Sequence, residues 1–289
     1  MSKVIRQVLA VALLAALVVL AGCSGSGAKS SLGDYSWSEL SAISAEIAAA
    51  DDDGEGRDIA MNYNLLNSSG KLDGKTKSIT LSDGTKASVM IAGVRADDLA
   101  GGGKAGLTFV FADAPAVHEM NDDASNEGGW EKSEMRSWLN SDFLDKLPSD
   151  LKGVIQAANK KTNSSAYTSP GAVGTTSDKL WLPSLVELGG SVSPNDLVGG
   201  SRIPAETYNA EGKQYQVFAD CGDAALVRTF TGDDSEESGI VVTGEASPWW
   251  QRSLSTTWTS GFEAVSDEGD PLNAWITDYA LGVSPGFCL

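Results

Sequence analysis

The chain has 289 residues, of which 42% are hydrophobic and 21% are charged, a balance typical of a globular protein and not of a disordered one. Its 39 Asp and Glu residues outnumber 21 Lys and Arg residues, giving a formal net charge of −18. This charge excludes nucleic acid as an expected partner, because phosphate contacts need a basic surface. One histidine excludes sites built from several histidines, and three cysteines exclude a dense disulfide framework.

Residues 1–22 are typical of a bacterial lipoprotein signal peptide. Lys3 and Arg6 precede the apolar run 8–20, which is shorter than the roughly 18–20 residues of a membrane-spanning helix. The run ends in LAGC, which resembles the lipobox whose cysteine receives a lipid. We therefore expect Cys23 to anchor the protein to the cell membrane through acyl chains, with the body outside the cytoplasm. An ordinary secretory signal is the alternative.

The rest of the chain predicts a tether followed by one domain. Residues 23–35 are rich in Ser and Gly and lack periodicity, as flexible tethers do. Residues 36–289 contain no internal repeat and no Pro-rich hinge, so we expect a single α+β domain with two early helices and irregular antiparallel β-structure later.

Apolar residues spaced three or four positions apart predict helices, and alternation of apolar and polar residues predicts strands. These patterns predict helices over 37–50, 131–146 and 151–161, a hairpin over 77–94 with its turn at Asp83-Gly84, strands over 107–111 and 215–218, and short β-runs after Pro248.

Motifs in residues 90–289 resemble, in their order, an uncharacterised family of bacterial surface domains. The clearest is GGWEKSEMRSWLN at 128–140, and further motifs follow at 147–148, 178–184, 211–215, 249–253 and 282–287. The resemblance implies a C-type-lectin-like fold, which formylglycine-generating enzymes and phage receptor-binding proteins also have. Gln251 and Ser284 depart from the family's pattern, in which an apolar residue and an arginine are usual.

Cys221 and Cys288 are the cysteines that remain after lipidation. An even pair outside the cytoplasm favours a disulfide, which would stabilise the fold by roughly 3–4 kcal/mol. Two free thiols are the alternative, and the resemblance to formylglycine-generating enzymes implies a third, a thiol pair for copper and oxygen chemistry. Asp220 and Asp223 oppose thiolate formation at Cys221, which disfavours that third interpretation.

The adjacent residues Trp249 and Trp250 indicate a binding surface. Neighbouring residues of a strand point to opposite faces, so one indole should face solvent or a ligand. Exposed tryptophans stack on sugar rings or anchor protein partners. We therefore expect a surface that binds a glycan or a protein, formed by Trp249, Trp250, Gln251, Arg252, Trp258 and Asp267. A two-layer core that buries both indoles is the alternative.

Two further groups have weaker chemical support. His118 could act as a general base, but no nucleophile motif accompanies it, which favours a surface or capping role. Asp51, Asp53 and Glu55 resemble half of a calcium loop, although Asn62 stands where a bidentate Glu belongs, so calcium is retained only as an alternative.

Together these features predict a binding module without catalysis and without a cofactor. An enzyme of the envelope, either a formylglycine-generating-like oxidase or a carboxylate hydrolase, is the first alternative. A structural envelope protein is the second.

Overall fold

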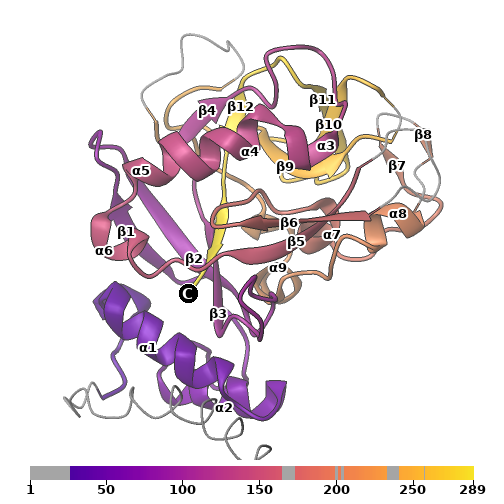
Figure 1. The fold of residues 1–289 in the computed structure, drawn as a ribbon. Coiled ribbons are helices and arrows are strands. Elements are labelled where there is room, and N and C mark those ends of the chain that lie inside the picture. The colour runs from indigo at the N-terminus through magenta and orange to yellow at the C-terminus, as the bar shows by residue number, and fades with distance from the viewer. Residues whose placement is uncertain (1–26, 165–172, 199–200, 203–204, 233–240, 257) are drawn as a thin grey trace, which may run out of the picture.

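The computed structural model describes residues 27–164, 173–198, 201–202, 205–232, 241–256 and 258–289 (Figure 1). Helices and mostly antiparallel strands alternate along the chain, which confirms the predicted α+β class. The predicted signal segment and Cys23 lie outside the described residues. Within the described ranges no helix has the length and apolar character needed to cross a membrane.

The first sheet has four strands in the order β1-β2-β3-β13, and all its pairs are antiparallel. Their bounds are Thr76–Thr80, Lys86–Val94, Leu107–Phe111 and Gly286–Cys288. The predicted hairpin is confirmed as β1 and β2, and the predicted strand over 107–111 is confirmed as β3. The last strand of the chain thus completes a sheet begun near its N-terminus.

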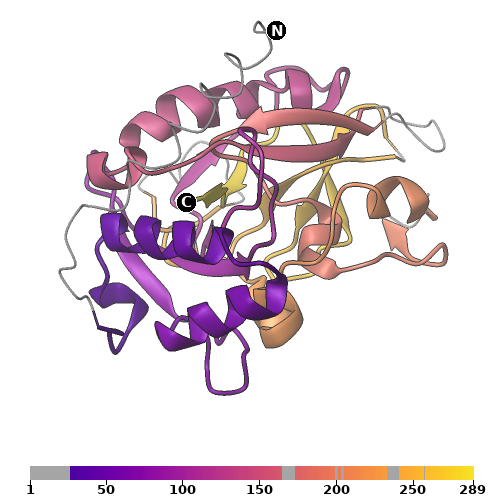
Figure 2. The same cartoon turned by 60° about the horizontal axis from the view of Figure 1, so that its bottom comes forward.

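Two helices precede this sheet in the sequence. A short 3-10 turn, η1 (Leu32–Asp34), comes before both of them. They are α1 (Trp37–Ala48) and α2 (Asp53–Asn62), which lie together in Figure 2. On α1, Trp37 meets Phe109 and Phe287 edge-to-face, with ring centroids 5.7 and 6.0 Å apart. Because these phenylalanines belong to β3 and β13, one aromatic cluster joins the first helix to two neighbouring strands of this sheet.

The acidic stretch after α1 begins α2. The carboxylate of Asp52 accepts a hydrogen bond from Glu55 N at 2.9 Å, which caps the helix. Asp53 lies 3.0 Å from Arg95 Nε, and Glu55 accepts from Asp51 N at 2.6 Å. These acids are therefore engaged in capping and pairing, and in the described part of the chain no three potential metal ligands come together.

The second sheet has five strands in the order β11-β10-β9-β12-β4. Their bounds are Asn273–Ile276, Gly261–Val265, Trp249–Leu254, Leu281–Val283 and Ala116–His118. The β9–β12 pair is parallel and the others are antiparallel. Strand β4 therefore stands at one edge of the sheet and β9 in its interior.

The predicted helix over 131–146 is interrupted. It forms α3 (Gly129–Lys132), α4 (Glu134–Trp138), the π-helical η2 (Leu139–Phe143) and α5 (Leu144–Lys146). Ser133 ends α3, and its hydroxyl caps α4 by accepting from Arg136 N at 3.2 Å. Met135, Leu139 and Phe143 are buried as the pattern predicts, whereas Trp138 is half-buried.

Two predicted elements are wrong. Of the helix predicted over 151–161, only the short α6 (Ser149–Lys152) is formed. Strand β5 (Ala158–Asn163), which pairs with β6 (Val173–Asp178), takes the place of its second half. Lys160 faces inward on β5, so the strand's alternation was hidden by a charged residue. The predicted strand over 215–218 is the start of α9.

The other elements are α7 (Leu185–Gly189), β7 (Leu197–Val198), β8 (Ser201–Arg202), α8 (Ala205–Asn209), α9 (Gln216–Cys221) and η3 (Asp223–Ala225).

A buried ionic cluster joins β5, α7 and β9. Lys160 Nζ lies 2.5 Å from Asp97 Oδ1 and 2.6 Å from Glu187 Oε1, and it donates to Tyr215 Oη at 2.9 Å. Arg252 donates to both carboxylate oxygens of Glu187. Although burial alone would raise the pKa of Glu187, Arg252 and Lys160 outweigh it and hold that pKa at about 2. Glu187 is therefore ionised at neutral pH.

Glu211 lies beside this cluster in a different state. Its carboxylate accepts from Asn163 N at 3.0 Å and from the hydroxyl of Ser253. Burial raises the pKa of Glu211 to about 7, because the lowering effect of Arg252 does not offset the loss of hydration. Glu211 therefore titrates close to neutrality in the folded protein.

We predict that Glu211 makes the protein less stable as pH rises. Its pKa is about 7 in the folded protein and 4.5 for an unperturbed glutamate, so the folded state holds the extra proton between these values. The free energy of unfolding therefore falls by roughly 2–3 kcal/mol between pH 5 and pH 8 through this group. In Glu211→Gln that part of the pH dependence disappears, as denaturant unfolding at both pH values will measure.

The matched control is Glu268→Gln, which makes the same change on an exposed side chain. It is expected to keep the slope of the unmodified protein. An equal slope in Glu211→Gln and in the unmodified protein contradicts the assignment.

Candidate binding groove

The tryptophan surface expected from the sequence is not formed at Trp249, Trp250, Gln251 and Arg252, because all four side chains are fully buried. Strand β9 is an interior strand, and both of its faces are covered. The indole N–H of Trp249 donates to Leu226 O at 2.9 Å, and the side-chain amide of Gln251 donates to Pro271 O at 2.8 Å. The two-layer core weighed as the alternative is what the structure contains.

The remaining two residues of that predicted surface are exposed. Trp258 is 37% exposed and Asp267 is also exposed, but they lie beyond opposite ends of β10. A five-residue strand is about 17 Å long, so these two side chains do not lie side by side. Trp258 and Asp267 therefore do not form one surface with each other or with the four buried residues.

The expected disulfide between Cys221 and Cys288 is not formed, because both are free thiols. Cys221, at the end of α9, donates to Leu72 O at 3.6 Å, whereas Cys288 on β13 lies 3.4 Å from Thr108 Oγ1. Burial raises the pKa of both thiols, and the carboxylates of Asp220 and Asp97 add to it, so neither thiol is activated as a nucleophile.

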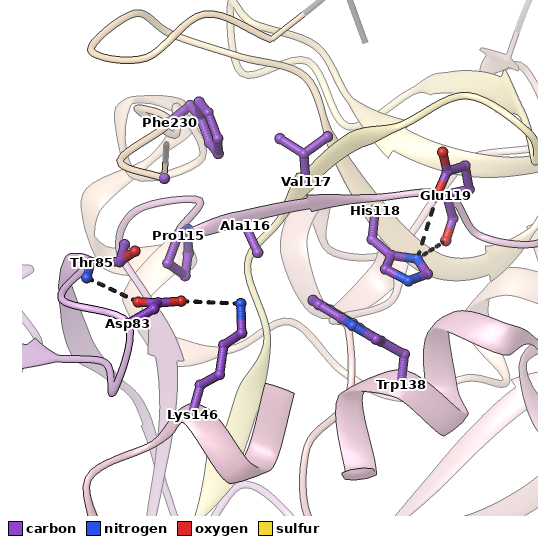
Figure 3. A pocket seen from close by; sticks show the side chains of 11 residues that line it. Asp83, Thr85, Pro115, Ala116, Val117, His118, Glu119, Trp138, Lys146 and Phe230 are labelled. Carbon is purple, nitrogen blue, oxygen red and sulfur yellow. Dashed lines mark hydrogen bonds and ion pairs between the residues drawn. The ribbon is translucent and has the colours of Figure 1, made fainter. Parts of the chain in front are cut away.

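A groove of about 580 Å³ runs beside strand β4 (Figure 3). It is lined by Asp83, Thr85, Pro115, Ala116, Val117, His118, Glu119, Trp138, Lys146, Phe230 and Gly232. Figure 3 shows the strand residues between an ion pair at one end and a cluster of His118, Glu119 and Trp138 at the other. We call this hollow the β4 groove.

The outer edge of β4 lies along this groove. Gly282 N donates to Pro248 O, so the peptide groups of Gly282 point toward β9 and those of its neighbours on β12 point toward β4. Gly282 stands opposite Val117 in the antiparallel β4–β12 register. The N–H and C=O of Val117 are therefore directed away from β12, on the side of β4 where no strand of the described residues is paired with it.

One end of the β4 groove is an aromatic cluster. The rings of His118 and Trp138 lie 4.4 Å apart between centroids. His118 Nδ1 lies 2.6 Å from the carbonyl oxygen of Glu119, which can only accept, so Nδ1 carries the proton and Nε2 is an acceptor. The carbonyl of His118 accepts from Trp250 Nε1 at 2.9 Å. A buried indole of the second sheet thus supports this end of the groove.

The other end is an ion pair across two elements. Lys146 Nζ of α5 lies 3.0 Å from Asp83 Oδ2 in the β1–β2 turn. Asp83 also accepts from Thr85 N at 3.0 Å, and this bond followed by Lys146 lowers the pKa of its carboxyl. Both side chains are partly exposed, so the pair presents a positive and a negative group at this end of the groove.

Sequence reasoning found parts of this groove but did not bring them together. The Asp83 turn and His118 follow from the sequence, whereas Trp138 shares the spacing of the buried Met135 and Leu139 and has no separate signal of its own. The π-helical turn that follows Trp138 shifts the helix face, and no spacing signal predicts it.

Residues 105–289 match the protein family described as Domain of unknown function (DUF6273). The chain belongs to this family. No curated protein and no solved structure matches it. The matched region of this DUF6273 member begins just before β3, so α1, α2, β1 and β2 precede it. Of the β4 groove, Asp83 and Thr85 also come from the part that precedes the match.

We predict two free thiols of very different accessibility. In the full chain with Cys23→Ser, one thiol, the half-buried Cys221, should react slowly with an aromatic disulfide reagent at neutral pH. The second, Cys288, should react only after denaturation, because it is fully buried. Adding Cys221→Ser should remove the native reaction alone. Failure of any thiol to react in denaturant without a reductant would show a disulfide and contradict this structure.

Proposed function

We propose that this protein is a lipid-anchored, extracytoplasmic binding module that holds an extended segment of a protein partner in the β4 groove. The observation that carries the proposal is the coincidence of a sheet edge with a large groove: Val117 turns its peptide N–H and C=O away from β12, and it lines the same hollow as Trp138 and Lys146.

An extended segment suits this geometry for a simple reason. A strand added to a sheet edge satisfies the unpaired backbone groups of both chains, while the flanking pockets select its side chains. Here Pro115, Ala116 and Val117 supply an apolar strip, and Trp138 supplies a larger apolar contact. The Asp83–Lys146 pair and the half-exposed carboxylate of Glu119 would fix the direction of the bound segment by their charges.

A glycan suits the groove less well. Sugar rings bind by stacking on an open aromatic face. One face of Trp138 is already covered by the His118 ring at 4.4 Å, and Phe143 lies 5.3 Å away. The surface that remains on Trp138 suits an apolar side chain better than the flat face of a sugar.

The anchor and the location rest on the sequence. The LAGC motif ending at Cys23, after a short apolar run with Lys3 and Arg6 before it, supports lipidation and export. The order of motifs over 128–287 supports a C-type-lectin-like fold, with which the α+β class of the described residues is compatible.

The predicted flexible tether 23–35 is wrong in its second half, because Leu32 and Tyr35 are buried in the domain and Lys29 lies 2.6 Å from Glu39. On this proposal the residues between Cys23 and Lys29 would hold the groove away from the bilayer.

The proposal predicts that displayed random decapeptides will yield binders to the full chain purified in mild detergent. Trp138→Ala should weaken these binders by about 30-fold, as expected for loss of an aromatic anchor worth about 2 kcal/mol. Val117→Pro removes the outward-facing N–H without removing a donor from the β4–β12 pairing and should weaken them up to about tenfold. Fluorescence anisotropy with the enriched peptides measures both.

Trp258→Ala is the matched control, because Trp258 is also a partly exposed tryptophan but does not line the groove. It should leave peptide affinity unchanged. A glycan array is probed in parallel. Binding of glycans without peptides, or loss of peptide binding in Trp258→Ala alone, would overturn the proposal.

A further inference from the structure

The protein has a second hollow, which shares no lining residue with the β4 groove. It has a volume of about 540 Å³ and is bordered by α2, the segment 93–98, Lys104, β5 and the segment 210–216. Figure 2 shows α2 in indigo beside the orange helix α9, which begins directly after Tyr215. We call this hollow the α2–β5 cleft. Its floor contains Lys160, Glu187 and Tyr215 of the buried ionic cluster.

Every carboxylate that lines the α2–β5 cleft already has a partner. Asp53 lies 3.0 Å from Arg95, and Asp98 lies 2.8 Å from Lys104. Asp97 and Glu187 both contact Lys160, and Glu211 accepts from Asn163 N and from Ser253. The acids of the cleft are therefore neutralised or hydrogen-bonded by the protein itself.

Three cations of the same cleft have no such partner. Arg57, Lys161 and Lys213 line the cleft and are exposed. Across the described ranges, none of the three lies within ion-pair distance of a carboxylate. In a chain with a formal charge of −18, a cleft whose unpaired charges are all positive is a local exception.

We propose that the α2–β5 cleft binds an oligoanion, a ligand with at least two phosphate or carboxylate groups. The three unpaired cations come from separate elements, Arg57 from α2, Lys161 from β5 and Lys213 from the segment before α9. Because they stand on three separate elements around one hollow, a ligand with separated charges suits them better than one small anion.

The overall negative charge does not prevent this binding. Charges separated by more than about 10 Å are largely screened at 0.1 M salt, whereas a cation in contact with the ligand is not. Arg57 offers a planar fork of donors that matches two oxygens of a phosphate or carboxylate, and the lysines act as point charges. Beneath the rim, the buried cluster keeps β5 and the segment 210–216 in place.

The site depends on residues that precede the family match and on residues within it. Arg57 and Lys104 precede residue 105, whereas Lys161 and Lys213 follow it. The cleft is therefore formed by packing of α2 and the segment 93–104 on the DUF6273 region. It is independent of the β4 groove, since no residue lines both.

The test uses the full chain in mild detergent with two probes, inorganic tripolyphosphate and tetra-aspartate, titrated calorimetrically at 50 and 200 mM salt. We expect at least one probe to bind, more weakly at the higher salt. The triple variant Arg57→Gln, Lys161→Gln, Lys213→Gln should weaken that binding at least tenfold. Preference for the first probe identifies phosphate as the bound group, and preference for the second identifies carboxylate.

The matched control is Lys86→Gln, Lys132→Gln, Lys179→Gln, which removes three exposed cations that do not line the cleft. Its affinity should stay within twofold of the unmodified chain. Absence of binding by both probes, or equal weakening in the two triple variants, overturns the proposal. Single variants, each expected to weaken binding about threefold, cover a folding defect in the triple variant, and three unaffected single variants also overturn it.

Discussion

The structure depends on one buried carboxylate, that of Glu187, held between Lys160 and Arg252. The three residues come from α7, β5 and β9, which are far apart in the sequence. Taking these charges out of water costs several kcal/mol each, and the cost is offset only while all partners are in place. The cluster therefore fixes how the second sheet sits on the β5–β6 hairpin, and a chain lacking one partner would keep an uncompensated buried charge.

Both proposed binding regions are attached to this cluster. Arg252 and Trp250 are two positions apart on β9, and Trp250 supports the carbonyl of His118 at the end of the β4 groove. On the opposite side, Asp97 and Tyr215 bind Lys160 and border the α2–β5 cleft. A fully hydrogen-bonded buried network is rigid, so it holds the residues of both hollows in place from one core.

The sequence predicted the elements whose signal is local. The helix α1, the β1–β2 hairpin and the strand β3 each follow from spacing and turn residues. It could not predict pairing between distant polar residues, although the motifs contain them. Arg136 of the 128–140 motif lies 2.6 Å from Asp178 of the 178–184 motif, and Asn140 donates to Leu180 O at 2.9 Å. Polar residues that resemble a binding set thus form the internal framework. The groove was missed for the same reason, since its lining joins a turn, an edge strand and a π-helical turn.

Arg228 is a third buried cation beside Lys160 and Arg252. It has no ion pair with a carboxylate of the described residues and is held by Ala225 O at 2.6 Å and by Ser284 Oγ at 2.9 Å, with Trp249 beneath its guanidinium at 4.9 Å. Burial lowers the pKa of Arg228 to about 10, which still leaves it charged at neutral pH. Ser284 is also fully buried, and a larger side chain at this position would compete with Arg228 for the enclosed space.

Among the described residues three cations (Lys160, Arg228, Arg252) and five acids (Asp97, Asp178, Glu187, Glu211, Glu263) are buried, so the exposed surface stays strongly acidic, as the net charge indicates. Exposed cations without an ion pair also occur elsewhere among the described residues, as at Lys86, Lys132 and Lys179. Arg57, Lys161 and Lys213 differ from them because they stand around one hollow whose acids are already engaged. Surface charges contribute little to stability one by one. Their placement here is better explained by a ligand that supplies the missing negative charge than by a contribution to folding.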